Sequence, residues 1–157
     1  MTEIAERAGV AATSLYRRWG EVSVLLLEVA ADQLNREHPL PDTGTLDGDL
    51  RAWGQRIAAA LRSKRGFAFF QVIVASAARG GVRDSARVRA MEPRLKQIEA
   101  MLNRARERGE QAPPVSEVLD HLVAPLYFRA LFGAPGDRTF AAGLVDHLLR
   151  SCRDDPL

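Results

Sequence analysis

The chain has 157 residues and a mass of 17.3 kDa, enough for one well-packed core or for a small head on a larger body. Its net charge of +2 and pI of about 9.1 are compatible with DNA binding but too weak to argue for it alone. The single cysteine, Cys152, excludes an internal disulfide, and no apolar run approaches the ~18 residues that span a bilayer, so we expect a cytoplasmic protein with no membrane partner. A hydrophobic fraction of 46% with only 6% aromatic residues favours helices over strands, and we expect an all-α fold.

Residues 2–19 read as two short helices joined by a turn at Gly9 and Val10. The first helix has a small apolar face, and we expect Thr2 to cap its N-terminus. Gly9 supplies the positive φ that a chain reversal needs, and Val10 is expected to be an apolar plug between the two helices. The pattern therefore predicts a helix-turn-helix.

The second helix has an inward and an outward side. Leu15 and Trp19 recur at i and i+4, so both are expected to face the first helix. On the outward side, Tyr and Arg side chains can donate to phosphate oxygens, and a residue near the helix start can reach a base edge. We therefore predict a DNA-binding set made of Ala11, Ala12, Thr13, Tyr16, Arg17 and Arg18. The alternative is two core helices joined by a glycine turn with no nucleic-acid role.

This stretch closely resembles the DNA-binding segment of the TetR family of transcriptional regulators, which reads roughly T-x-x-x-I-A-x-x-A-G-V-S-x-x-T-L-Y-x-x-F/W. The matching residues are Ile4-Ala5, Ala8-Gly9-Val10, Leu15-Tyr16 and Trp19. The resemblance implies a helix-turn-helix head on a helical ligand-binding and dimerisation body.

The sequence also departs from the family pattern. The family usually has Ser at the position of Ala11, where it caps the recognition helix, and often Lys at the position of Val22, where it meets a phosphate. It also places a further helix before this motif, and the sequence starts at Met1 without one. A start upstream of the printed one and a real loss of part of the DNA-binding half are both open alternatives.

Residues 23–37 form the next helical pattern, with Leu26, Val29, Ala30 and Leu34 on its apolar stripe. This helix is expected to connect the head to the body. In the resembled family, the connecting helix is the lever that changes the separation of the two recognition helices when an effector binds.

Three further helices are expected between residues 45 and 108. The first runs to about residue 64 and buries Leu50, Trp53, Ile57 and Leu61. Residues 67–79 are apolar nearly all round, which favours a central helix. The third extends from about residue 84 to 108 and has a basic outward face, which is either a solvated surface or a second DNA surface.

Residues 115–131 and 140–150 carry the most regular apolar rhythm in the chain. Two adjacent helices with such wide apolar faces have more surface than the rest of a small chain can cover, so we expect a homodimer. Dimers of the resembled family close in this way, through two helices from each subunit. The expected interface residues are Val115, Leu119, Leu122, Leu126, Phe140, Leu144 and Leu148.

A small-molecule site is expected among the central helices, where the resembled family usually holds its effector. Large, adaptable apolar side chains line such cavities. The candidates are Trp53, Phe67, Phe70, Ile73, Met91, Met101 and Tyr127. The alternative is that these residues simply fill the core.

We expect no enzymatic activity, no cofactor and no metal site. The sequence contains no GxSxG, HExxH or phosphate-binding glycine loop, and His38, His121 and His147 are far apart in the chain. A helical enzyme remains a distant alternative.

We predict three segments: a partial helix-turn-helix domain at 1–22, a connecting helix at 23–38, and a ligand-binding and dimerisation domain at 39–157. The predicted function is that of a TetR-like regulator. It would bind double-stranded operator DNA as a repressor that a small-molecule effector releases. The alternative is a truncated or degenerate relative that keeps only a dimeric ligand-binding body.

Overall fold

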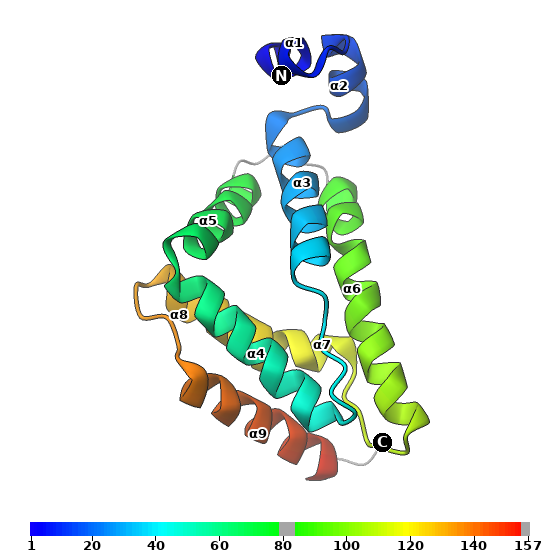
Figure 1. Cartoon of the computed structure of the whole chain (residues 1–157), viewed down its shortest axis with the longest axis vertical. Coiled ribbons are helices and arrows are strands. Elements are labelled where there is room, and N and C mark those ends of the chain that lie inside the picture. The colour runs from blue at the N-terminus through cyan, green and yellow to red at the C-terminus, as the bar shows by residue number, and fades with distance from the viewer. Residues whose placement is uncertain (79–83, 155–157) are drawn as a thin grey trace. The chain divides into compact units, whose positions relative to one another are not determined.

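The computed structural model describes residues 1–78 and 84–154, and throughout these ranges every regular element is a helix. The all-α prediction is confirmed. In chain order (Figure 1) the elements are α1 (Thr2–Ala8), α2 (Ala12–Trp19), α3 (Val22–Glu37), α4 (Leu46–Arg62), α5 (Lys64–Ala78), α6 (Asp84–Glu107), α7 (Val115–Val118), η1 (Leu119–Val123), α8 (Ala124–Leu131) and α9 (Arg138–Asp154).

The chain divides into two compact units. Unit 1 consists of Met1–His38 and Phe69–Arg94, and unit 2 consists of Pro39–Ala68 and Leu95–Leu157. The division differs from the three predicted segments, because Phe69–Arg94 was expected in the body and groups instead with the N-terminal part. Helices α5 and α6 each contribute residues to both units.

In unit 1, the buried stripe of α3 agrees only in part with the predicted one, of which Ala30 is buried as expected. Val24, Leu27 and Ala31 lie at i, i+3 and i+7 and are buried, whereas Leu26 and Val29 of the predicted stripe are exposed. The sequence VSVLLLEVAA has apolar residues on most of the helix circumference, so periodicity alone did not decide which side faces inward.

In unit 2, α4 is the central helix and packs against both α8 and α9 (Figure 1). Its N-terminus is capped by Thr45, whose side chain accepts a hydrogen bond from the Gly48 amide at 3.1 Å. The predicted inward face is confirmed, since Leu50, Trp53, Ile57 and Leu61 are all buried. At Gly54, α4 and η1 approach so closely that a Cβ added to Gly54 would lie 3.2 Å from Leu122 Cδ1.

Polar contacts hold the start of α4 in unit 2. Asp49 is fully buried, and its Oδ1 accepts hydrogen bonds from the Thr43 amide at 2.5 Å and the Thr43 hydroxyl at 2.8 Å. The Leu46 amide donates to Glu110 Oε2 at 2.8 Å, which ties the start of α4 to the loop after α6. The Leu46 amide is one of the backbone donors that a helix start leaves unpaired, and Glu110 satisfies it.

Residues 115–131 form one continuous helical segment with a π turn in its middle. The turn, η1, closes with a hydrogen bond from the Ala124 amide to the Leu119 carbonyl. Pro125 explains it, because proline has no N–H to donate to His121 four residues earlier and its ring would clash with that carbonyl in an α-helix. Of the helices described, none is both long and apolar enough to cross a membrane.

Candidate nucleic-acid interface

The turn between α1 and α2 is built by Gly9. Its φ of 67° lies in the left-handed region, where glycine has no Cβ penalty. The Gly9 amide donates to the Glu6 carbonyl at 3.2 Å, and the Val10 amide donates to the Ala5 carbonyl at 3.0 Å. This pair of bonds is a Schellman motif, which satisfies the last carbonyls of α1 and sends the chain into α2.

Two details of the predicted turn are wrong. Thr2 is the first residue of α1 and not its cap, because Met1 occupies the N-cap position. Val10 is 47% exposed, so it is not a plug between the helices. The residues that pack α1 and α2 together are Ala5 and Leu15, which are 2% and 8% exposed.

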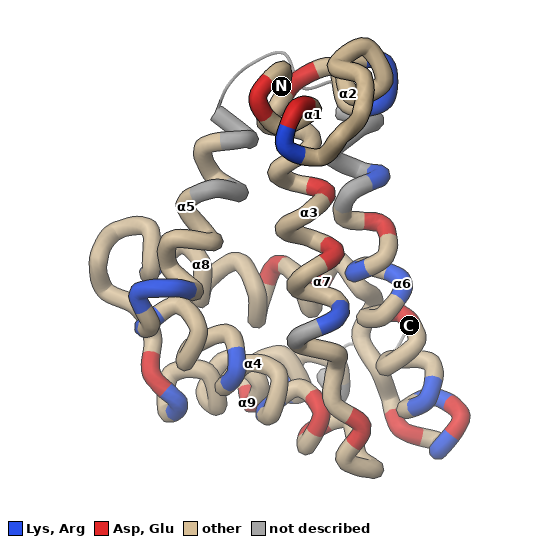
Figure 2. Tube along the Cα trace, turned by 45° about the horizontal axis from the view of Figure 1, so that its top comes forward, with Lys and Arg blue, Asp and Glu red and all other residues tan. Residues whose placement is uncertain are grey.

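Helix α2 places three of the predicted DNA-binding side chains on one exposed face. Thr13, Tyr16 and Arg17 lie at i, i+3 and i+4 and are all exposed, with buried Leu15 on the side that packs inward. In Figure 2 the basic stretch of α2 lies at the end of the helix, whereas α1 carries acidic as well as basic residues. The exposed face combines hydrogen-bond donors with a positive charge, as phosphate recognition requires.

The start of α2 offers fewer groups that could contact DNA. Ala11 is the N-cap of α2 and makes no side-chain cap, as expected from the missing Ser. Ala11 is exposed and Ala12 half-buried, and both present only methyl groups.

Arg18, also in the predicted DNA-binding set, is exposed like Arg17 but has partners within the chain. Its Nη2 donates to Glu28 Oε1 of α3 at 3.0 Å, and its Cζ lies 4.7 Å from the centre of the Trp19 ring. Trp19, expected to face α1, is half-buried and donates from Nε1 to Glu28 Oε2 at 2.8 Å. Sequence reasoning missed Glu28, because no spacing rule links residues nine and ten positions apart across a glycine turn.

The described basic side chains between Arg94 and Arg108 have partners within the chain. Arg94 is buried and donates to the His38 carbonyl at 2.9 Å. Nearer the helix end, three arginines have acidic partners: Arg104 Nε lies 3.4 Å from Asp42 Oδ2, Arg106 Nη1 lies 2.9 Å from Glu99 Oε1, and Arg108 Nε lies 2.8 Å from Glu110 Oε1. This arrangement favours a structural and solvated face over a second DNA surface.

The predicted ligand-binding residues are distributed over both units. Trp53 and Met101 are buried, and Phe67 and Tyr127 half-buried, within unit 2. Phe70 and Met91 belong to unit 1, and the side chain of Ile73 lies outside the described residues. The ligand-binding assignment stays a prediction.

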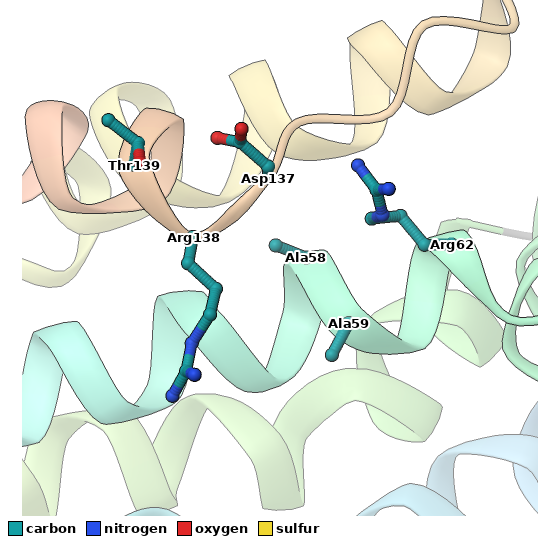
Figure 3. A pocket seen from close by; sticks show the side chains of 6 residues that line it. All are labelled: Ala58, Ala59, Arg62, Asp137, Arg138 and Thr139. Atoms are coloured by element: carbon teal, nitrogen blue, oxygen red, sulfur yellow. The ribbon is translucent and has the colours of Figure 1, made fainter.

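An open pocket in unit 2 is lined by none of these residues. It lies between α4 and the start of α9, and its lining residues are Ala58, Ala59, Arg62, Asp137, Arg138 and Thr139. Figure 3 shows the Arg62 and Arg138 side chains pointing in different directions, so the two guanidinium groups do not converge on a common ligand. Arg138 instead donates to Gln55 Oε1 at 3.1 Å.

The helices predicted to form the dimer also contribute side chains to the core of unit 2. Leu122, Leu126 and Leu148 are fully buried within unit 2, so these three expected interface residues belong to its core. The other four, Val115, Leu119, Phe140 and Leu144, are half-buried. The large exposed apolar side chains of α8 and the residue after it are Phe128, Leu131 and Phe132, which are 64%, 50% and 69% exposed.

Within residues 1–78 and 84–154, no three potential metal-ligating side chains come together. His121 and His147 do meet, with ring centroids 5.9 Å apart. His38 lies at the end of α3.

Known proteins resemble the chain in sequence and in fold. The family model described as the tetracyclin repressor-like C-terminal domain matches residues 40–148. The HTH-type transcriptional regulator AqdR of Rhodococcus erythropolis is 34% identical over 108 residues, which are 69% of this chain and 52% of AqdR. The DNA-binding transcriptional repressor TetR of Mycobacteroides abscessus is 30% identical over 152 residues, which are 95% of this chain and 80% of that protein.

Among solved structures, the TetR family transcription regulator SCO0332 superposes with a TM-score of 0.76 at 27% identity. The match covers 94% of this chain and 84% of that structure. By contrast, the chain spans only about half the length of AqdR.

Proposed function

Because this chain belongs to the TetR family of transcriptional regulators, we propose that it binds double-stranded operator DNA through α2 and acts in the cytoplasm as a repressor released by a small-molecule effector. The observation that carries the DNA-binding part is the exposed face of Thr13, Tyr16 and Arg17 over a buried Leu15. A repressor role is in keeping with the relative from Mycobacteroides abscessus, which is described as a DNA-binding transcriptional repressor.

The exposed side chains have different roles in this proposal. Arg17 has no ion pair or hydrogen bond among the described residues, so its guanidinium group is available to a phosphate. Tyr16 offers a hydroxyl donor to the backbone, and Thr13, near the helix start, is the candidate for a base-edge contact. Ala11 and Ala12 can add methyl contacts, for example to thymine.

A homodimer would present two copies of α2 to two half-sites related by two-fold symmetry. We propose that the outer surfaces of α8 and α9 form this dimer, with Phe128, Leu131 and Phe132 as the exposed apolar part. Such a patch is typical of a surface that another protein covers. The operator would then be roughly palindromic.

The effector is proposed as an apolar or aromatic small molecule. To release the DNA, it must bind one arrangement of the dimer better than the other. A ligand panel should therefore raise the melting temperature in proportion to the logarithm of ligand concentration above Kd, and Tyr127→Ala should weaken this response. Absence of any shift across a broad panel would favour a filled core.

The central experiment selects bound duplexes from a randomised pool and measures their affinity by fluorescence anisotropy at several salt concentrations. Arg17→Ala should weaken binding to all duplexes and reduce the salt slope by about 0.9, because one phosphate is no longer neutralised. Thr13→Ala should change the selected sequence more than the slope. Sequence-blind binding that salt abolishes completely would contradict operator recognition and favour a dimer without specific DNA binding.

A further inference from the structure

Glu28 of α3 joins the recognition helix to the helix that follows it. Its two carboxylate oxygens accept from different residues of α2: Oε2 from Trp19 Nε1 at 2.8 Å and Oε1 from Arg18 Nη2 at 3.0 Å. Arg18 also lies over the Trp19 ring at 4.7 Å. The three side chains form a closed set, which we call the Glu28 latch.

The Glu28 latch spans the glycine turn between α2 and α3. Between α2 and α3 the chain passes through Gly20, with φ 73° and ψ −53°, a conformation that residues with a side chain rarely adopt. No side-chain atom of Glu21 caps the start of α3. Because glycine constrains its own dihedrals least of all residues, the side-chain bonds of the latch contribute directly to the angle at which α2 leaves α3.

The latch also occupies one of the two adjacent arginines of the recognition helix. Arg17 is unpaired among the described residues, whereas Arg18 is bound to a carboxylate. The Arg18 and Glu28 side chains are 67% and 45% exposed, and an ion pair this open to water is weak enough for another anion to replace. A DNA phosphate near the end of α2 is such an anion.

We propose that Glu28 is a positioning residue with two effects: through Trp19 it holds the recognition helix against α3, and through Arg18 it competes with the DNA backbone for a cation. This inference rests on the proposed DNA binding by α2. Glu28 would thus limit the affinity of the chain for DNA, because it holds α2 in place but also keeps Arg18 from a phosphate.

The two effects separate in two substitutions. Glu28→Gln keeps an amide oxygen that can accept from Trp19 but loses the charge that holds Arg18, so DNA affinity should rise about two- to fivefold at low salt. Its salt slope should steepen by about 0.9, because Arg18 gains a phosphate. Glu28→Ala also loses the Trp19 bond, so it should bind the selected duplex more weakly than Glu28→Gln and discriminate less between duplexes.

A matched control is Glu21→Gln, which removes the same charge from the same part of the chain. Glu21 accepts from the Ser23 hydroxyl at 3.1 Å and is not part of the latch. This variant should leave the salt slope unchanged. The double variant Glu28→Gln with Arg18→Ala should lose the increase in affinity that Glu28→Gln shows alone.

A readout without DNA checks the latch itself. The chain has two tryptophans, so the protein labelled with 5-fluorotryptophan gives two ¹⁹F resonances, with Trp53 in unit 2 as the internal reference. Glu28→Ala should move the Trp19 resonance and leave that of Trp53 in place. A Trp19 resonance that does not move would overturn the positioning effect.

Equal affinity and slope for Glu28→Gln and the parent, with the parent binding DNA, would overturn the competition for Arg18. A second outcome is that the parent binds no duplex at all, while the Trp19 resonance still moves in Glu28→Ala. In that case the proposed DNA binding and the competition for Arg18 both fail, but the contact between Glu28 and Trp19 stands. The two failures are therefore distinguishable.

Discussion

Replacing Leu122 and Phe128 separately tests which side of the 115–131 segment faces the chain's own core. Leu122 is fully buried and lies near Gly54 of α4, whereas Phe128, six residues later, is 64% exposed. Leu122→Ala should therefore leave a cavity between α4 and η1 and cost about 3 to 5 kcal/mol of unfolding free energy. For a chain of this size that corresponds to a fall of about 6 to 20 °C in melting temperature.

Phe128→Ala should behave in the opposite way. Its ring is mostly in water in the single chain and touches Phe132 at a centroid distance of 4.8 Å, so the monomer loses about 0.5 kcal/mol or less. If the exposed surface of α8 is the dimer interface, loss of a central aromatic residue raises the dimer dissociation constant about 30-fold, equivalent to about 2 kcal/mol. The assays are thermal unfolding at one fixed protein concentration and sedimentation velocity across a dilution series, because dimerisation makes the melting temperature concentration-dependent.

If Leu122→Ala dissociates a dimer but does not lower the melting temperature, Leu122 is not a core residue. A monomer that Phe128→Ala destabilises as much as Leu122→Ala does would refute the outward assignment of Phe128. A parent protein that sediments as a monomer at all concentrations would remove the dimer proposal and leave the core assignment of Leu122 to be judged by its melting temperature.

Three other outcomes follow from single sites. Gly9→Val should destabilise the α1–α2 turn by about 1 to 2 kcal/mol and weaken DNA binding, because the φ of 67° at this position disfavours a β-branched residue. A steric clash is not the cause, since no neighbouring atom lies within 4 Å of a Cβ added to Gly9. Asn tolerates a positive φ, so Gly9→Asn should recover most of the loss. Asp49→Ala should lower the free energy of unfolding by about 1 to 3 kcal/mol, measured in urea, because the Thr43 donors lose their acceptor, and Asp49→Asn should cost less. The hydrogen bond from the Leu46 amide, and to a smaller extent the contact with Arg108, hold the pKa of Glu110 below its ordinary value. The Glu110 carboxylate therefore contributes stability above about pH 4.3, and this contribution is lost as pH falls through the lower pKa of the folded state. Acid unfolding of Glu110→Gln should show a smaller dependence on pH in that range, and an unchanged dependence would contradict the assignment.

Local patterns in the sequence were enough to predict the helices, the turn and the family. Short-range rules were sufficient for the turn, because Gly9 needs only its neighbours to form the Schellman motif. The inward face of α4 also followed from spacing, because Leu50, Trp53, Ile57 and Leu61 recur at i, i+3, i+7 and i+11 and are, with Leu46, the large apolar residues of this helix. The outward position of Thr13, Tyr16 and Arg17 followed in the same way.

Packing between helices, in contrast, decides how the wide apolar faces are shared. In α3 and in residues 115–131 the apolar residues cover more than one side, so periodicity could not tell Leu27 from Leu26, or whether Leu122 faces the chain's own core or a second chain. The choice depends on which neighbouring helix covers which side, and that is a property of the packed chain. The same holds for Glu28, whose bonds to Arg18 and Trp19 exist only because the Gly20 turn brings α3 alongside the end of α2.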